Sequence, residues 1–177
     1  TVGITAAVHG NELNGISVIQ RLFGEIDVDE LNGTIVGVPV VNYPSFIRKK
    51  RRFNDGVDLN HIMPGKIDGN VSQVYAYRFL ERMAKHFDYL LDLHTASTGR
   101  INSYYVRADM DLSIVNKMAL LQNADIIVDQ NKKYGWGNET VYLAGSEANG
   151  IDFYHSSTHL GRWRTAGLSV NTNVTAS

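Results

Sequence analysis

The stretch that decides the fold is residues 2–8 (VGITAAV), which run directly into residues 9–12 (HGNE). An apolar run of this kind is typical of a buried strand in a parallel sheet. Residues 89–93 (YLLDL) have the same character and run directly into His94. Because α/β proteins bind ligands where strands pass into the following loops, we expect both strand ends to lie at one edge of a sheet.

These strand ends bring together two imidazoles and one carboxylate. A catalytic zinc site takes three such ligands and leaves a fourth position open. Taken singly, the residues also fit a structural role. His9 could cap the start of a helix, Glu12 could lie in its first turn, and His94 could be a hydrogen-bonded polar residue at a strand end. Because they occur together, we favour one zinc ion per chain held by His9, Glu12 and His94. Asp92, on the same strand as His94, either orients an imidazole or bonds to a neighbouring loop.

The composition is that of an ordinary globular domain. The chain has 177 residues, of which 44% are hydrophobic and 20% are charged. A formal net charge of −1 gives the whole chain no attraction to nucleic acids or acidic membranes. Because cysteine is absent, disulfides and thiolate ligands are excluded, and any metal is held by histidine and carboxylate.

Two further expectations concern location and chain ends. No apolar run reaches the roughly 18 residues that a membrane span needs, and no signal peptide is recognisable, so we place the protein in the cytoplasm. The chain starts inside a strand pattern without a methionine, and its polar ending does not resemble a domain edge. We therefore expect residues 1–177 to be a single zinc-hydrolase domain truncated at both ends.

The rest of the chain alternates between helical and strand patterns. Apolar spacing, a candidate cap at Asn11 and a stop at Gly24 predict a helix over 11–24. A stripe from Val71 to Phe87 predicts a second helix. Further strands are expected at 34–41, 88–93, 101–106, 124–128 and 151–157, and further helices at 111–121 and 139–149. This alternation predicts an α/β fold: a mostly parallel, mixed sheet with helices on both faces.

The long polar segment between residues 42 and 70 contains the one dense charge run, residues 48–52 (RKKRR). No aromatic residues interleave with these charges, so a solvated loop is favoured over a nucleic-acid patch. A third reading is that one arginine turns inward to bind a carboxylate or polarise a carbonyl. Residues 55–65 (DGVDLNHIMPG) are typical of turns, and Asp58 and His61 within them are less favoured candidates for metal ligands.

Four pieces of sequence, in this order, resemble the succinylglutamate desuccinylase and aspartoacylase family of zinc carboxypeptidase-like amidohydrolases. His9 and Glu12 match its HGxE zinc motif. An arginine then precedes residues 55–60 (DGVDLN), which with Pro64-Gly65 are similar to its DGxDLNRxFPG loop. Residues 91–94 (LDLH) match the strand that carries the third zinc ligand. The resemblance extends over about residues 2–150 and implies the same fold and the same three zinc ligands.

The resemblance also implies which residues contact the substrate. It places Arg52, or Arg51, and Asn60 against the substrate, and gives Arg52 the catalytic role of stabilising the oxyanion. His61 stands where the family usually carries arginine. Binding of the substrate carboxylate is therefore expected to be weaker, indirect or pH-dependent.

One departure from the family concerns the general base, a glutamate on a late strand in a pattern like TxELG. Here the last glutamate is Glu147, within a predicted helix, and residues 157–161 (STHLG) put His159 at the glutamate position. The resemblance also implies a C-terminal β-rich domain, which we do not expect within residues 1–177. We therefore expect this chain to bind metal with little or no turnover, and Glu147 and Glu139 are the next candidates for the base.

Three functions remain open on the sequence. The first is a metal-dependent hydrolase of amide bonds in N-acyl amino acids or small peptides, with a small molecule as its partner and neither nucleic acid nor membrane. The second is a metal- or ligand-binding module that lacks the general base. The third is a nucleic-acid-binding α/β domain that uses residues 48–52.

Overall fold

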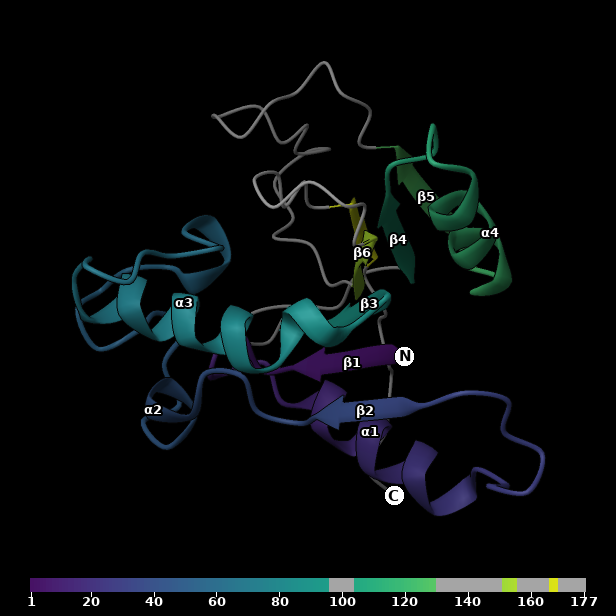
Figure 1. Cartoon of the computed structure of the whole chain (residues 1–177), viewed down its shortest axis with the longest axis horizontal. Helices are drawn as coiled ribbons and strands as arrows, with labels where there is room; N and C mark the ends of the chain where they lie inside the picture. The colour runs from purple at the N-terminus through teal and green to yellow at the C-terminus, as the bar shows by residue number, and fades with distance from the viewer. Residues whose placement is uncertain (96–103, 130–150, 156–165, 169–177) are drawn as a thin grey trace.

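A computed structural model describes residues 1–95 and 104–129, together with the backbone of residues 151–155 and 166–168 (Figure 1). Its elements, with η for 3-10 helices, are β1 (Val2–Ala6), α1 (Asn14–Glu25), β2 (Ile35–Val38), α2 (Tyr43–Phe46), η1 (Leu59–His61), α3 (Val71–Arg82), η2 (Ala84–His86), β3 (Tyr89–Leu93), β4 (Tyr105–Ala108), α4 (Ser113–Leu121), β5 (Ile126–Asp129), β6 (Ile151–His155) and β7 (Ala166–Leu168).

The strands form one mixed sheet in the order β2-β1-β3-β6-β4-β5, with β7 paired to β6. β1 pairs in parallel with β2 and β3, and β4 pairs in parallel with β5 and β6. The two groups meet where β3 and β6 run antiparallel. The carboxyl ends of β1 and β3 therefore lie at the same edge, as expected from the sequence.

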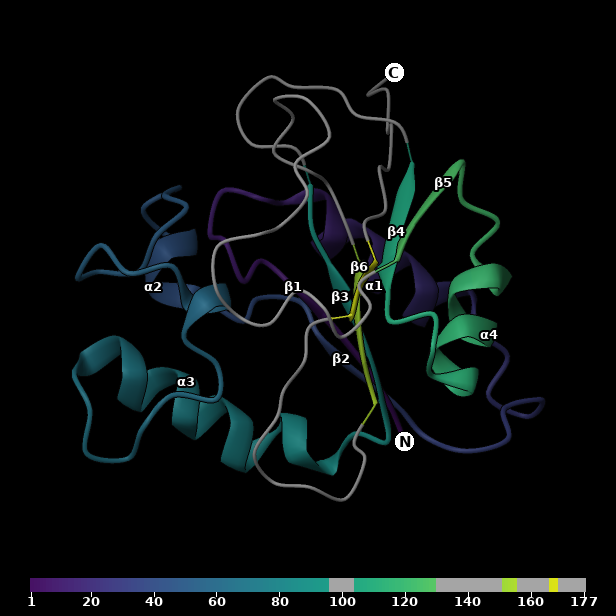
Figure 2. The ribbon, with the colours of Figure 1, turned by 90° about the horizontal axis from the view of Figure 1, so that it is seen from above.

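Helices cover both faces of this sheet, as predicted. α1 and α4 pack on one face, where Ile19 and Val115 join a core with Ile4, Leu93 and Val106. α3 covers the other face, where Leu80 packs with residues that include Phe87 and Leu90. Figure 2 shows α3 and α4 on opposite sides of the strands. The predicted α/β fold class is confirmed.

The first helix begins later than the sequence pattern predicts. α1 starts at Asn14, and the residue before it, Leu13, makes no capping hydrogen bond through its side chain. The predicted cap at Asn11 is therefore wrong. Residues 9–12 form a separate turn in which the Glu12 amide donates to the His9 carbonyl oxygen at 3.0 Å. Glu12 thus lies before the helix rather than in its first turn.

The predicted helix over 71–87 divides into α3 and η2. The buried positions of α3 are Ser72, Ala76 and Leu80, one residue further along than the predicted stripe. Val71, which that stripe places inside, is 60% exposed. Tyr75 and Phe79 of the predicted stripe are partly buried and pack against the core beside this face, and Phe87 is fully part of it.

The remaining predictions differ in their boundaries. β2 is shorter than the predicted strand over 34–41, α4 begins two residues inside 111–121, and β5 is displaced from 124–128 by two residues at its start. The strand expected at 101–106 corresponds to β4, although residues 101–103 are outside the described residues. β6 occupies most of 151–157, β7 was not predicted, and the helix expected at 139–149 lies outside the described residues.

No helix within residues 1–95 and 104–129 combines the length and the apolar character needed to cross a bilayer.

The turn after β1 depends on Gly10, and a pair of glycine variants tests this. A Cβ at Gly10 would overlap the backbone of Ser45 and Phe46, whereas nothing lies within 4 Å of a Cβ at Gly24 in α1. Gly10→Ala is therefore expected to lower the free energy of unfolding by about 1–3 kcal/mol. Gly24→Ala should leave it unchanged or raise it by up to about 1 kcal/mol. Denaturant unfolding of both variants measures the difference, and equal effects would contradict this account of the turn.

Candidate metal centre

The end of β1 is shaped so that His9 turns towards β3. Ala7 has φ of 52°, a left-handed conformation that residues other than glycine rarely adopt. The Asn42 side-chain amide donates to the Val8 carbonyl oxygen at 2.9 Å and fixes the chain after this bend. Backbone strain of this kind is concentrated at functional sites. The strand therefore ends in a turn that is hydrogen-bonded to Asn42 and carries His9 and Glu12.

Three buried side chains meet at this edge of the sheet. His9, Glu12 and His94 are 3%, 2% and 7% exposed, and their ligand atoms all lie within 4.8 Å of one another. Nδ1 of His9 lies 2.8 Å from Oε1 of Glu12, and Nδ1 of His94 lies 2.9 Å from Oε2. The two Nδ1 atoms are 3.2 Å apart. The residues singled out in the sequence are thus brought together by the fold.

Each histidine also contacts a second carboxylate through its outer nitrogen. Nε2 of His9 lies 3.1 Å from Oδ1 of Asp58, in the loop before η1. Nε2 of His94 lies 2.8 Å from Oδ2 of Asp92, on β3. Both ring nitrogens of each histidine therefore face a carboxylate, Glu12 at Nδ1 and a second one at Nε2. A proton on Nε2 would be held by the outer carboxylate and would leave Nδ1 as the ligand atom, an arrangement that outer carboxylates impose on metal-binding histidines.

This arrangement requires positive charge at its centre. With Nε2 protonated, a neutral imidazole presents a lone pair at Nδ1. Both Nδ1 atoms face oxygens of Glu12 at less than 3 Å, so two pairs of acceptors would oppose each other. Either protons on both Nδ1 atoms or one shared cation removes that repulsion. The donor set itself, two imidazole nitrogens and a carboxylate, suits zinc.

Hydrogen bonds and neighbouring charges shift the pKa values of these buried groups in the direction opposite to the effect of burial. Burial alone would lower the pKa of His9, but its hydrogen bonds to Asp58 and Glu12 outweigh burial and raise that pKa. Burial would raise the pKa of Glu12, yet the hydrogen bonds from His9 and His94 hold it well below its usual value. The pKa of Asp58 is lowered against burial by the hydrogen bond to His9 and by the charge of Arg51. Glu12 and Asp58 are therefore ionised at neutral pH.

Of the two candidate arginines, Arg51 reaches the centre. Its Nη1 donates to Oε1 of Glu12 at 2.9 Å, and its Nε lies 3.4 Å from Oδ2 of Asp58. The guanidinium of Arg52 instead donates to the Gly56 carbonyl oxygen at 3.3 Å, in an exposed position. One arginine of the run has thus turned inward, the third reading of the charge run.

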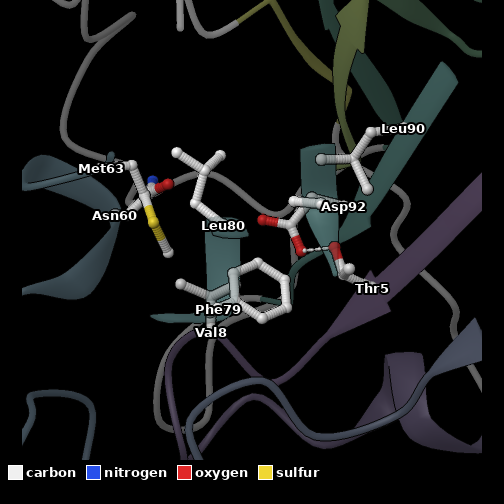
Figure 3. Close-up of a pocket in the computed structure, with 9 residues that line it drawn as sticks. Thr5, Val8, Asn60, Met63, Phe79, Leu80, Leu90 and Asp92 are labelled. Atoms are coloured by element: carbon white, nitrogen blue, oxygen red, sulfur yellow. Dashed lines mark hydrogen bonds between the residues drawn. The ribbon is translucent and has the colours of Figure 1, made fainter. Parts of the chain in front are cut away.

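The other predicted substrate contacts lie in the surroundings of the three ligands. Asn60 donates its backbone amide to Oδ1 of Asp58 at 3.0 Å. Its side chain lines a cavity of about 20 Å³ that also borders Asp92 and Met63 (Figure 3). His61 is exposed at the end of η1. Burial would raise the pKa of Asp58, and the charge of His61 adds to the lowering that His9 and Arg51 cause. Asp58 is not among the three grouped ligands and contacts His9 from outside.

An open hollow on the side of the charge run shares Arg51 with the centre. Its volume is about 460 Å³, and its lining includes Arg48, Lys50, Arg51, Arg52 and Phe53. This size suits a small-molecule ligand, and four cationic side chains make it attractive to anionic groups. The candidates for the general base, His159, Glu147 and Glu139, lie outside the described residues.

Sequence reasoning missed two parts of this centre. It did not connect Asp58 with His9, because the two are 49 residues apart and no spacing rule joins them. It also missed Thr5, whose hydroxyl lies 2.6 Å from Oδ1 of Asp92. The parallel alignment of two apolar strands could have suggested that second contact, because Thr5 and Asp92 are the polar positions of their runs.

Comparisons with known proteins identify the family. Residues 1–152 match the model of the succinylglutamate desuccinylase/aspartoacylase catalytic domain. The N-alpha-acetyl-L-2,4-diaminobutyric acid deacetylase of Halomonas elongata is 32% identical over 96 residues, which are 54% of this chain and 28% of that protein. A solved aspartoacylase family protein from Mesorhizobium loti has a TM-score of 0.61 and 27% identity, over 71% of this chain and 42% of that one.

A more distant solved structure agrees in fold alone. Murine aminoacylase 3 has a TM-score of 0.50 and 18% identity, over 71% of this chain and 46% of that one. The chain therefore spans less than half the length of each of these three proteins. Because the family model covers residues 1–152 of 177, and the fold and the order of the motifs agree with it, this chain belongs to the succinylglutamate desuccinylase/aspartoacylase family.

Proposed function

We propose that this chain is the catalytic domain of a zinc-dependent hydrolase that cleaves amide bonds in N-acyl amino acids or small peptides. The observation that carries the proposal is the buried group of His9, Glu12 and His94, whose ligand atoms lie within 4.8 Å of one another. Membership in a family whose relatives are named as a deacetylase and an aminoacylase supports the reaction type.

The three side chains fit a zinc ion in size as well as in chemistry. Zinc bonds of about 2.0–2.2 Å in tetrahedral geometry separate neighbouring ligand atoms by about 3.3–3.6 Å. The observed separations are 2.8 and 2.9 Å, to the two different oxygens of Glu12, and 3.2 Å between the imidazole nitrogens, so the side chains would move apart by less than about 1 Å to admit the ion. When bound, zinc would supply a water of lowered pKa and a Lewis acid for the scissile carbonyl.

Arg51 is the residue that we propose for polarising the carbonyl. Its guanidinium lies against Glu12 and Asp58 and is 32% exposed, so it borders the ligands while still facing the open hollow. A fixed cation in that position stabilises negative charge that develops on a substrate oxygen. The position of Arg52 against Gly56 favours Arg51 for the role that the resemblance gave to Arg52.

The hollow beside the centre supports a substrate that carries a carboxylate. Arg48, Lys50 and Arg52 line it together with Arg51. Such a site would hold the carboxylate of an N-acyl amino acid with its amide directed to the ligands. Asn60 and His61 remain proposed contacts from the η1 side, with His61 as a titratable substitute for the usual arginine.

A metal-binding module without hydrolytic activity is the second candidate. It is motivated by His159, which stands where the family pattern carries glutamate. The two candidates share the metal centre and differ in turnover alone, so metal binding and activity are measured separately below. Both assays use the full-length protein.

The metal centre predicts one zinc ion per chain. Chelator-treated protein should take up one equivalent of Zn²⁺ in a titration followed by elemental analysis. His94→Ala removes one of the three ligands and should weaken binding by at least about 10–100-fold. The matched control is His86→Ala, at an exposed position in η2. Equal zinc uptake by wild type and His94→Ala would contradict the site.

The hydrolase proposal predicts zinc-dependent release of carboxylate and free amine from an N-acetyl amino acid. Activity should disappear after chelation and return when Zn²⁺ is added. Release that persists without metal would sink the proposed mechanism. Stoichiometric zinc with no release from a panel of N-acyl amino acids would favour the second candidate. If release is observed, His159→Ala shows whether it depends on that residue.

Substitution of the two neighbouring arginines is expected to change kcat/KM to different extents. Arg51→Ala should lower kcat/KM by about 10²–10³-fold, because it removes a charge donor beside the reacting carbonyl. Arg52→Ala removes a contact to the Gly56 carbonyl oxygen and should change kcat/KM by less than about tenfold. Thermal unfolding of both variants controls for stability. A larger loss for Arg52→Ala would return the catalytic role to that residue.

A further inference from the structure

We infer that Thr5 is a positioning residue for the metal centre, which holds Asp92 and, through it, the ligand His94. The inference rests on the proposed zinc site and adds to it a residue that does not contact the ligands themselves. It starts from one observation: the two oxygens of the Asp92 carboxylate have different partners. Oδ1 accepts from the Thr5 hydroxyl at 2.6 Å, and Oδ2 accepts from Nε2 of His94 at 2.8 Å.

The strand register places these groups side by side. Thr5 of β1 and Asp92 of β3 are direct neighbours in the parallel pairing of the two strands. Side chains alternate along a strand, so Asp92 and His94 point to the same face, the face that α3 covers. Each of the two strands also leads to a ligand, since His9 follows β1 and His94 follows β3. The hydrogen bond therefore links the two strands that present the metal ligands.

The hydroxyl proton of Thr5 is committed to this contact. Thr5 has one other acceptor nearby, the Leu91 carbonyl oxygen, at 3.5 Å. A hydroxyl has a single proton, and the bond at 2.6 Å is much the stronger of the two. A charge-assisted bond to a carboxylate is also about twice as strong as a neutral one. Thr5 thus fixes the rotation of the Asp92 carboxylate about its Cβ–Cγ bond.

The surroundings of Thr5 leave little room for a water molecule that could replace its hydroxyl as the donor to Asp92. Thr5 is 2% exposed and Asp92 3% exposed. The adjoining cavity of about 20 Å³ holds one water at most, and apolar side chains such as Leu80 and Phe79 line it (Figure 3). Loss of the hydroxyl would leave Oδ1 short of a donor in an apolar environment. The carboxylate would then rotate to find one, and Oδ2 would no longer hold the ring of His94.

The central test is Thr5→Val, which removes the hydroxyl and keeps the shape. The dissociation constant for Zn²⁺ is measured on the full-length protein by competition with a chromophoric chelator. We expect weakening by about 3–10-fold, less than the 10–100-fold typical of removing a residue bonded directly to a ligand. Thr5→Ser, which retains the hydroxyl, should bind within about twofold of wild type. The visible spectrum of the Co²⁺-substituted protein should change in Thr5→Val and not in Thr5→Ser.

A double-variant cycle shows whether Thr5 acts through Asp92. Asp92→Asn should weaken Zn²⁺ binding by about 10–100-fold, and adding Thr5→Val should then cause little further loss. The matched control is Ser72→Ala, which removes another fully buried hydroxyl whose bond to Asn70 at 2.9 Å lies at the start of α3. It should lower thermal stability with no effect on Zn²⁺ affinity.

Each outcome bears on the inference. Wild-type Zn²⁺ affinity and an unchanged Co²⁺ spectrum in Thr5→Val, with reduced stability as in Ser72→Ala, would show a purely structural role and overturn it. Additive losses in the cycle would overturn it too. If Thr5→Val does not fold, Thr5→Ala removes the same hydroxyl without adding a methyl group. If wild-type protein itself takes up no stoichiometric Zn²⁺, the proposed metal centre fails first, and this result is distinct from the others.

Discussion

The interaction on which the rest of this structure depends is the meeting of two imidazole nitrogens with one buried carboxylate. Glu12 is 2% exposed and lies within 3 Å of both Nδ1 atoms. A buried carboxylate is costly unless charge or hydrogen bonds compensate it. Two features place the Glu12 carboxylate: the strained turn after β1 and the aligned ends of β1 and β3. The inward-pointing Arg51 compensates its negative charge. The fold near the edge of the sheet follows from that requirement.

The charges of the centre balance when a divalent cation is included. Glu12, Asp58 and Asp92 contribute three negative charges, and Arg51 contributes one positive charge. A divalent ion brings the sum to zero, and so do two protons on the Nδ1 atoms. An ion bound at the Nδ1 atoms would displace protons held there, so its affinity would depend on pH and would be coupled to folding. Without the ion, hydrogen bonds to the carboxylates outweigh burial and raise the pKa of His9, which favours its positively charged form.

The sequence predicted the parts of this centre that depend on local patterns. An apolar strand run ending in a ligand-type residue identified His9, Glu12 and His94, because a parallel sheet brings equivalent strand ends together. The choice between Arg51 and Arg52 was not predictable, since adjacent residues in a loop point in directions that only the turn geometry decides. The start of α1 was misplaced for a related reason: the turn that holds Glu12 takes precedence over the capping preference of Asn11.

Contacts between distant segments were the least predictable. Asp58 reaches His9 across 49 residues, and Thr5 reaches Asp92 across 87. Both depend on register, because a slip of one residue between β1 and β3 would turn Thr5 to the opposite face of the sheet. The same slip would separate the turn carrying His9 and Glu12 from His94. The pairing of Thr5 with Asp92 and the assembly of the three candidate ligands are thus satisfied by one alignment of the strands. An ion bound at the strand ends would therefore stabilise the register that builds its own site.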